Sequence, residues 1–218
     1  MRFGRVSAGA VRLTLAAVVL ALCGLATPAR ASSGDIVLYA SDATYVKGNW
    51  AKGSVAGAAD STAVLSTDLG WATPDAPLAS PPNYFEFTFD APAATNYRVW
   101  LRLRAKNNSK WNDAVWVQFS DSLLPSGDAA YRIGTTGGLM VNLERCAGCG
   151  TSGWGWQNSA YWLSQQTVVR FAGSGKHTLR VQTREDGAEV DQIVLSPVTF
   201  FDRAPGPAVN DNTIVPKR

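Results

Sequence analysis

Hydrophobic and polar residues alternate with a period of two in several segments of the chain. In segment 84–89 the aromatic residues Phe85, Phe87 and Phe89 share one face of an extended strand. Segments 97–104 and 115–119 alternate in the same way. Such alternation predicts β-strands that bury one face. Apolar runs predict further strands at 36–40, 63–66, 140–143, 167–171, 177–183 and 190–195.

Segments rich in glycine, proline, asparagine and aspartate separate these strands. Loop 68–83 contains four prolines, segment 106–113 is polar around a tryptophan, and segment 146–159 is rich in glycine. Segment 183–188 is a charged turn between two strong strands. No sustained helical period follows residue 31. We therefore expect an all-β fold, an antiparallel β-sandwich of jelly-roll type.

The first 31 residues have a different pattern from the rest of the chain. Arg2, Arg5 and Arg12 precede an apolar run at 13–25, and a small-x-small sequence ends at Ala31. This layout predicts a secretory signal peptide that is cleaved after Ala31, and the run is short for a membrane-spanning helix. The expected product is secreted, extracellular or periplasmic, with no stable membrane anchor once the signal is removed.

The chain therefore divides into three expected parts. A signal peptide covers 1–31, a β-sandwich domain covers 32–202, and a flexible, linker-like tail covers 203–218. The tail is expected to be flexible because it contains an Ala-Pro-Gly-Pro sequence followed by Asn-Asp-Asn.

Charge and histidine content exclude some classes of function. The formal net charge is +3, but without the first 31 residues sixteen basic residues face seventeen acidic ones. A net charge of −1 argues against a nucleic-acid partner that is bound through bulk charge. The only histidine, His177, excludes any site that needs two imidazoles, and it shares a phase with Leu179 and Val181, as a core or edge residue would.

Two cysteines remain after removal of the signal peptide, in the sequence Cys-Ala-Gly-Cys. In an oxidising compartment, Cys146 and Cys149 are expected to form a local disulfide that constrains a glycine-rich loop. A redox pair is the alternative, but the surroundings lack the strand-to-helix pattern that would support it.

Eight tryptophans are a high count for a chain of 218 residues. Trp154, Trp156, Gln157 and Asn158 lie together in Gly-Trp-Gly-Trp-Gln-Asn. Indole rings stack on the C–H faces of sugars, and amides hydrogen-bond to sugar hydroxyls. In an extended segment the two indoles point the same way, so they either line a sugar site or pack under the disulfide loop. Other tryptophans in or beside Gly/Asn-rich stretches are Trp50, Trp111 and Trp162.

Carboxylates crowd the segment 183–191, which contains Glu185, Asp186, Glu189 and Asp191. Three interpretations remain open: a solvated turn with ion pairs, a calcium site with hard oxygen ligands, or the acid/base pair of a glycosidase. Asp191 shares a phase with the apolar residues of the last strand, so we expect it to point inward. A buried carboxylate needs a metal or a hydrogen-bond partner.

Several of these segments, in this order, match a known family. Val-Leu-Tyr-Ala-Ser-Asp-Ala at 37–43, Asn-Tyr-Arg-Val-Trp-Leu-Arg at 96–102, Gly-Trp-Gly-Trp-Gln at 153–157, Gly-Lys-His-Thr-Leu-Arg-Val at 175–181 and Glu-Val-Asp-Gln-Ile-Val-Leu at 189–195 carry the resemblance. Over residues 36–200 the chain resembles carbohydrate-binding modules of families 6 and 35. The resemblance implies a calcium-dependent or calcium-stabilised, galactose-binding-like β-sandwich that binds sugars in loops at one end. Such modules are usually attached to secreted glycoside hydrolases.

The resemblance also implies roles for individual residues. Trp156 corresponds to the stacking aromatic of the family, and Trp50 lies where a second aromatic is expected. Glu189 stands where the family often has a sugar-bonding asparagine, which changes the donor and acceptor chemistry. Asp42 and Asp191 correspond to structural calcium ligands, whereas Ala40 replaces the first glutamate of that set.

The leading hypothesis is a secreted, non-catalytic protein that binds a polysaccharide or oligosaccharide through loop aromatics and polar groups. A separate secreted enzyme or surface protein would be its partner. The alternatives are a small polysaccharide-active enzyme of jelly-roll type and a structural or adhesive surface protein. The exposure of Trp111, Trp154 and Trp156 discriminates between them, because exposed tryptophans among polar groups favour sugar binding and buried ones favour a structural role.

Overall fold

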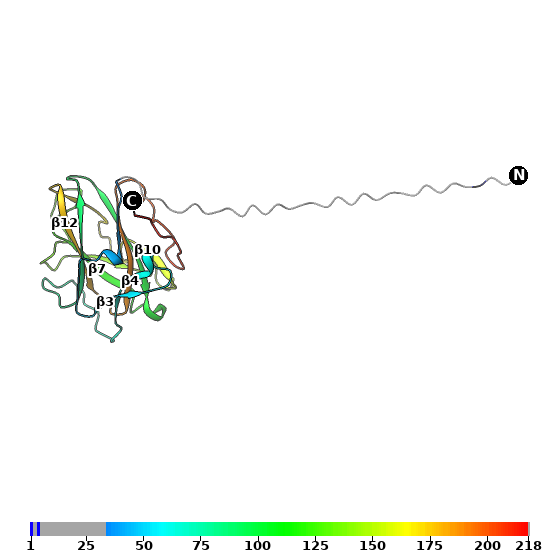
Figure 1. Cartoon of the computed structure of the whole chain (residues 1–218), viewed down its shortest axis with the longest axis horizontal. Helices are drawn as coiled ribbons and strands as arrows, with labels where there is room; N and C mark the ends of the chain where they lie inside the picture. Colours follow the sequence, from blue (N-terminus) through cyan, green and yellow to red (C-terminus); the bar gives the residue numbers. More distant parts are fainter. Residues whose placement is uncertain (2–3, 5–33, 218) are drawn as a thin grey trace.

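The computed structural model describes Met1, Gly4 and residues 34–217 (Figure 1). The predicted signal peptide falls on residues that, apart from Met1 and Gly4, are outside the described part. Within the described residues, no helix has the length and apolar character that crossing a membrane requires.

Two β-sheets stack into a sandwich (Figure 1). One sheet has the order β3-β4-β13-β6-β11-β8, with β1 also paired to β13 and β10 also paired to β6; the other has the order β2-β5-β12-β7-β9. The strands of the first sheet are β1 (Ile36–Tyr39), β3 (Trp50–Ser54), β4 (Thr62–Ser66), β6 (Tyr97–Ala105), β8 (Ser122–Leu123), β10 (Trp154–Gln157), β11 (Val168–Phe171) and β13 (Ala188–Ser196). Those of the second are β2 (Tyr45–Lys47), β5 (Tyr84–Ala91), β7 (Ala114–Phe119), β9 (Leu139–Asn142) and β12 (Gly175–Thr183). Three single turns, η1 (Ala40–Asp42), η2 (Ala59–Ser61) and η3 (Lys106–Asn108), complete the described elements.

The predicted antiparallel β-sandwich is confirmed. All nine strands that the alternation and the apolar runs predicted are present, and their pairings within the sheets are antiparallel. The strands β2, β3, β8 and β10 were not predicted because they are short or rich in glycine and lysine.

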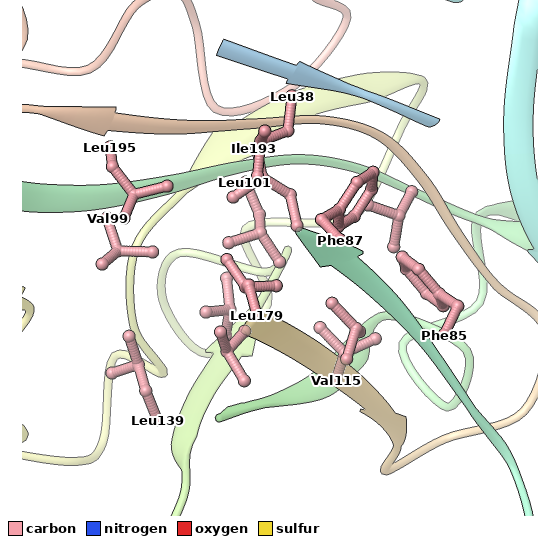
Figure 2. Packing of buried hydrophobic residues seen from close by; sticks show 14 of the residues in the cluster. Leu38, Phe85, Phe87, Val99, Leu101, Val115, Leu139, Leu179, Ile193 and Leu195 are labelled. Atoms are coloured by element: carbon pink, nitrogen blue, oxygen red, sulfur yellow. The ribbon is translucent and has the colours of Figure 1, made fainter. Parts of the chain in front are cut away.

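The core lies between the two sheets and is built from the predicted apolar faces (Figure 2). Phe85 and Phe87 of β5 meet Leu101 of β6 and Ile193 of β13 from the opposite sheet, all at or below 1% exposure (Figure 2). Burial of each such side chain stabilises the fold by about 1.5–3 kcal/mol. His177 also belongs to this buried region and stacks on Phe171 with ring centroids 4.1 Å apart.

The C-terminal segment is part of the folded domain, which differs from the expected flexible tail. Val215 is fully buried and packs with Trp156, while the Trp156 indole N–H donates to the carbonyl of Thr213 over 3.2 Å. Asp211 forms an ion pair of 2.7 Å with the buried Arg102. The proline and glycine content of the C-terminal segment resembles that of a linker. However, the apolar and cationic side chains on the outer face of the first sheet need both a cover and a counter-charge.

A β-bulge explains the broken alternation of the last strand. The register of β13 against β6 shifts between Val190 and Gln192, so Asp191 is the extra residue. Asp191 is fully buried, as expected, and has the hydrogen-bond partners that a buried carboxylate needs, but it does not face the apolar core between the sheets. Its carboxylate meets Arg102 beneath the C-terminal segment instead, with an N–O distance of 2.5 Å.

Candidate functional site

A cleft of about 420 Å³ lies among the loops that follow β4, β6 and β12. We call it the tryptophan cleft. Its lining includes two indoles, two carboxylates and two amides, which are Trp71, Trp111, Asp68, Asp186, Asn107 and Asn112. Trp111 is 67% exposed and Trp71 is 41% exposed. By contrast, five of the eight tryptophans are buried, and the cleft holds two of the three exposed ones.

Trp71 is positioned by a buried carboxylate from the turn after β12. Asp186 is 2% exposed, and its two oxygens accept hydrogen bonds from the backbone N–H groups of Leu69 and Trp71, the latter over 3.2 Å. Hydrogen bonds to a charged acceptor are stronger than neutral ones. Asp186 therefore fixes the backbone from which the Trp71 ring projects.

Asn112 connects the opposite wall of the cleft to Asp68. Its side-chain amide donates to Asp68 Oδ2 over 3.0 Å and to the Lys106 carbonyl over 3.2 Å. The neighbouring Gly187 has a φ of +83°, and a Cβ there would lie 2.7 Å from the Asn112 side chain. Only glycine suits this position, because any side chain would displace Asn112.

The turn η3 presents Asn107 to the cleft. Asn107 and Asn108 adopt left-handed φ values of +58° and +53°, a conformation that asparagine tolerates better than most residues. The glycine-rich loop braces this turn, because the Thr151 hydroxyl donates to the Asn108 carbonyl over 2.6 Å and the Gly153 N–H donates to Asn108 Oδ1 over 3.2 Å.

The predicted disulfide is confirmed, since Cys146 and Cys149 are bonded within this same loop. The Gly150 N–H, directly after the bridge, donates to Glu144 Oε1 over 3.3 Å. The disulfide therefore constrains the loop that supports η3.

A group of buried carboxyls lies behind the cleft. Asp113 Oδ2 accepts hydrogen bonds from the Glu144 N–H over 2.9 Å and from the Asn142 amide over 3.2 Å, while the Asp113 N–H donates to Glu185 Oε2 over 3.0 Å. Loss of hydration, together with the charges of Glu185 and Glu144, raises the pKa of Asp113 to about 8. None of the three lines the tryptophan cleft, so they act on it only through the packing of the loops.

The crowded acidic segment is consequently not a solvated turn. Glu185 and Asp186 are 4% and 2% exposed, and each accepts a backbone N–H from another loop. Ion pairs do occur, between Arg184 and Glu185 and between Arg104 and Glu189. Through these backbone hydrogen bonds, Glu185 and Asp186 connect their turn to two neighbouring loops.

The predicted stacking role of Trp156 and Trp154 requires correction. Both belong to β10 and point to the same face, as expected, but they are 1% and 5% exposed. Trp156 is covered by the C-terminal segment, and Trp154 packs with Val55 and Ala58 while the guanidinium of Arg104 lies 4.7 Å from its ring. A sugar has no access to either indole face in the folded chain.

The remaining predicted ligand residues, apart from Trp111, also lie outside the cleft. Trp50 is 4% exposed, packs edge-on against Phe85, and donates from its indole to the Thr183 hydroxyl over 2.8 Å. The Gln157 amide donates to the Leu143 carbonyl over 3.0 Å. Glu189 is ion-paired with Arg104, and Asn158 is half-buried beside Ser159. Of the predicted ligand residues, the structure places only Trp111 in the cleft.

The two aspartates assigned to calcium do not fit a metal site. Asp191 Oδ1 accepts the Ala59 N–H over 2.7 Å, and its other oxygen meets Arg102. Asp42 uses one oxygen for the Tyr39 N–H and the other for Lys217. Among the described residues, no group of three or more His, Cys, Asp or Glu side chains is arranged to hold a metal ion. Each carboxylate is already neutralised by a basic side chain.

Sequence reasoning missed Asp68, Trp71, Asn107 and Asn112, and it gave Asp186 no ligand role. The available signal was a lone tryptophan in a loop with four prolines, opposite a second tryptophan in the polar loop 106–113. Neither loop has the periodicity that identifies strands, so nothing in the sequence placed the two loops side by side.

No protein-family model matches the chain, and no curated protein matches it. Among solved structures, it is similar to a family 35 carbohydrate-binding module from Clostridium thermocellum, at 15% identity over 74% of this chain and 96% of that chain, with a TM-score of 0.44. It is also similar to a family 6 module of Cellvibrio mixtus lichenase 5A in complex with cellotriose, at 11% identity over 74% and 95% of the two chains, with a TM-score of 0.41. A third is the GH26-CBM35 β-(1,4)-mannanase of Podospora anserina, at 12% identity over 76% and 28%, with a TM-score of 0.46. The chain thus spans under a third of the mannanase but nearly all of the two modules.

Proposed function

We propose that this chain is a secreted, non-catalytic carbohydrate-binding protein and that the tryptophan cleft is its sugar site. One observation carries the proposal: Trp71 and Trp111, two exposed indoles, line one cleft together with carboxylate and amide side chains. Indole faces offer a flat apolar surface to the C–H groups of a pyranose, while carboxylates and amides bond to its hydroxyls.

Each group of the cleft has a distinct part in binding. Trp71 and Trp111 supply the stacking surfaces, and Asn107 supplies both a donor and an acceptor at the rim. Asp68 accepts hydrogen bonds from hydroxyls, oriented by the amide of Asn112. A partly open cleft of this size buries a limited ligand area, so the expected dissociation constant for a short sugar is on the order of micromolar to millimolar.

The non-catalytic assignment rests on what the carboxylates do. Hydrolysis of a glycosidic bond needs two carboxyl groups free to act as acid and as base or nucleophile. Both oxygens of Asp186 accept backbone N–H groups, and Asp68 accepts from Asn112. Asp113 and Glu185 are buried behind the cleft at 1% and 4% exposure. Asp186, Asp113 and Glu185 therefore hold the loops, and Asp68 is left as a single carboxylate facing the cleft, without the second free carboxyl that hydrolysis needs.

Affinity electrophoresis of the protein against a panel of polysaccharides tests the proposal. The panel includes β-1,4-glucan, β-1,4-mannan, β-1,3-glucan, xylan and galactan, and each polymer is run with wild type, Trp71→Ala and Trp111→Ala. Tyr45→Ala is the matched control, because Tyr45 is 47% exposed and lies outside the cleft. We expect at least one polymer to retard wild type and Tyr45→Ala but neither tryptophan variant. Absence of retardation across the panel, or equal retardation of all four proteins, contradicts the proposal.

A further inference from the structure

Three tryptophans remain exposed in this chain, and all three lie along one route over the surface. Trp71, Trp111 and Trp162 are 41%, 67% and 47% exposed. Trp71 and Trp111 line the tryptophan cleft, and Trp162 lines another hollow, which is described below as the sheet-face pocket. Exposed tryptophans that gather in hollows mark binding surfaces, whereas scattered ones need no explanation.

The loop 68–83, which we call the proline loop, borders every hollow on this route. Beyond Trp71 it lines a pocket of about 300 Å³, the proline pocket, with Leu78, Pro82 and Arg184 among the lining residues. Trp71 lines both the tryptophan cleft and the proline pocket, so the two hollows adjoin at this residue. A chain that leaves the cleft over Trp71 therefore enters the proline pocket.

A third hollow continues from the proline pocket. This sheet-face pocket of about 480 Å³ lies between the proline loop, the outer face of β7 and β9, and the segment that carries Trp162. The proline pocket and the sheet-face pocket share Ala76 and Arg184. The guanidinium of Arg184 lies 5.7 Å from the Trp162 ring centroid, and the buried indole N–H of Trp116 on the pocket wall has no hydrogen-bond partner among the described residues.

The proline loop is fixed at several points, so the route exists before any ligand arrives. Asp186 binds the backbone at its start, and in its middle the Leu78 N–H and carbonyl bond to the Gln182 side chain over 3.0 and 2.9 Å. Asn83 at its end accepts the Asn49 N–H over 2.8 Å. Four prolines further reduce its freedom. A preformed surface loses little affinity to ordering on binding.

From this geometry we infer that the three hollows form one continuous track and that the ligand is an internal stretch of a long polysaccharide. The inference rests on the proposed function and extends it, because a cleft alone would suit a short sugar or a chain end. In the track, one sugar unit stacks in the tryptophan cleft, the chain crosses Trp71 into the proline pocket, and units farther along contact Trp162 beside Arg184. The exposed indoles are spaced along the track with polar and apolar side chains between them. This spacing suits a polymer, because a polymer presents the same sugar unit at each position.

Isothermal titration calorimetry with oligosaccharides of increasing length tests the track. The probes are size-fractionated oligosaccharides of two to eight units, prepared from the polymer that binds in the panel above. The proteins are wild type, Trp111→Ala, Trp162→Ala and the control Tyr45→Ala. Because Trp162 is half exposed, its replacement leaves the core intact. Longer oligosaccharides also show a higher apparent affinity for statistical reasons. The comparison is therefore between protein variants with oligosaccharides of equal length.

We expect Trp162→Ala to bind two-unit and three-unit probes as wild type does, and to bind the eight-unit probe about fivefold more weakly, the loss of one aromatic contact. Trp111→Ala is expected to weaken binding of every probe. If Trp162→Ala matches wild type at all lengths while Trp111→Ala still loses affinity, the track is wrong and the sugar site stands. If Trp111→Ala also matches wild type at every length, both the track and the proposed site are wrong.

Discussion

The carboxylate of Asp186 and the backbone of Trp71 are joined across 115 residues of sequence by a hydrogen bond of 3.2 Å. This bond ties the turn between β12 and β13 to the proline loop, which connects β4 to β5. Since β4 and β5 belong to different sheets, the loop crosses from one sheet to the other. Loops that join the two sheets thus form the tryptophan cleft, and the position of Trp71 depends on the buried carboxylate of Asp186.

Replacing Asp186 separates the position of Trp71 from the presence of its ring. In Asp186→Ala the N–H groups of Leu69 and Trp71 lose their acceptor, which costs about 1–3 kcal/mol of stability. We expect sugar affinity to fall as in Trp71→Ala, although the indole is still present. Urea unfolding and titration with the sugar that binds measure the two effects, and Asp90→Ala, an exposed aspartate, is the control. Unchanged affinity in Asp186→Ala would show that the backbone anchor does not orient Trp71.

The pH dependence of stability should reveal the buried Asp113. Its pKa is raised to about 8 in the folded chain, mainly because burial removes water, whereas its ordinary value is 3.8. Folding therefore takes up a proton between these two values. The stabilisation is complete below about pH 4 and is lost as the pH rises through about 8. Urea midpoints measured at pH 5.5 and pH 8.5 should fall with rising pH.

Asp113→Asn provides the matched variant for this pH effect. In this variant the amide oxygen of residue 113 still accepts the Glu144 N–H. The amide has no titrating proton, so residue 113 no longer contributes to the pH dependence. We expect the fall in urea midpoint between pH 5.5 and pH 8.5 to be smaller in Asp113→Asn than in wild type. An identical fall in the two proteins would exclude Asp113 as its source.

The C-terminal segment should prove essential to the domain. Asp211→Ala removes one of the two carboxylates that neutralise Arg102, whose side chain is fully buried. Removal of one partner from a buried ion pair costs about 3–5 kcal/mol. Loss of the segment also uncovers Trp156. We expect a lower urea midpoint and red-shifted tryptophan fluorescence before global unfolding. Asp202→Ala, at an exposed residue directly before this segment, should behave like wild type; equal stability of both variants would contradict this role.

Chelation of divalent cations should leave the fold unchanged. Asp191 is neutralised by Arg102, and Asp42 by Lys217, so neither is free to ligate calcium. We expect the Tm measured by calorimetry to be the same in 5 mM EDTA as in 5 mM calcium chloride, a pair of conditions that brackets calcium sites of ordinary affinity. A rise in Tm of several degrees with calcium would reveal a metal site that these two aspartates do not explain.

Period-two alternation was sufficient to predict the sandwich, because each strand with a buried face has an unmistakable pattern. It could not say what covers the outer faces. Trp156 was read as a sugar-stacking residue because it lies among glycines and amides, yet Val215 and its neighbours cover it. Thr213, which accepts the hydrogen bond of the Trp156 indole, lies 57 residues farther along the chain. No local sequence pattern predicts a contact over that distance.

The cleft was beyond prediction for a related reason. Trp71 and Asp186 come from loops whose conformation depends on each other, and loops lack a period. Trp111 alone was identified, because it stands in a short polar loop directly after a strong strand. The charged turn was noticed as unusual, but its carboxylates were interpreted as solvated, metal-binding or catalytic groups, since backbone N–H groups from a distant loop leave no trace in the sequence.

The most direct test of the account is which indole N–H signals respond when a sugar is added. All eight tryptophans fall in the described residues, and each contributes one signal to a ¹H–¹⁵N spectrum, assignable with single Trp→Phe variants. Titration with the sugar that binds should shift the signals of Trp71 and Trp111 and leave those of Trp154 and Trp156 in place. Shifts confined to Trp154 and Trp156, with Trp71 and Trp111 unmoved, would place the sugar site on β10 and contradict the account.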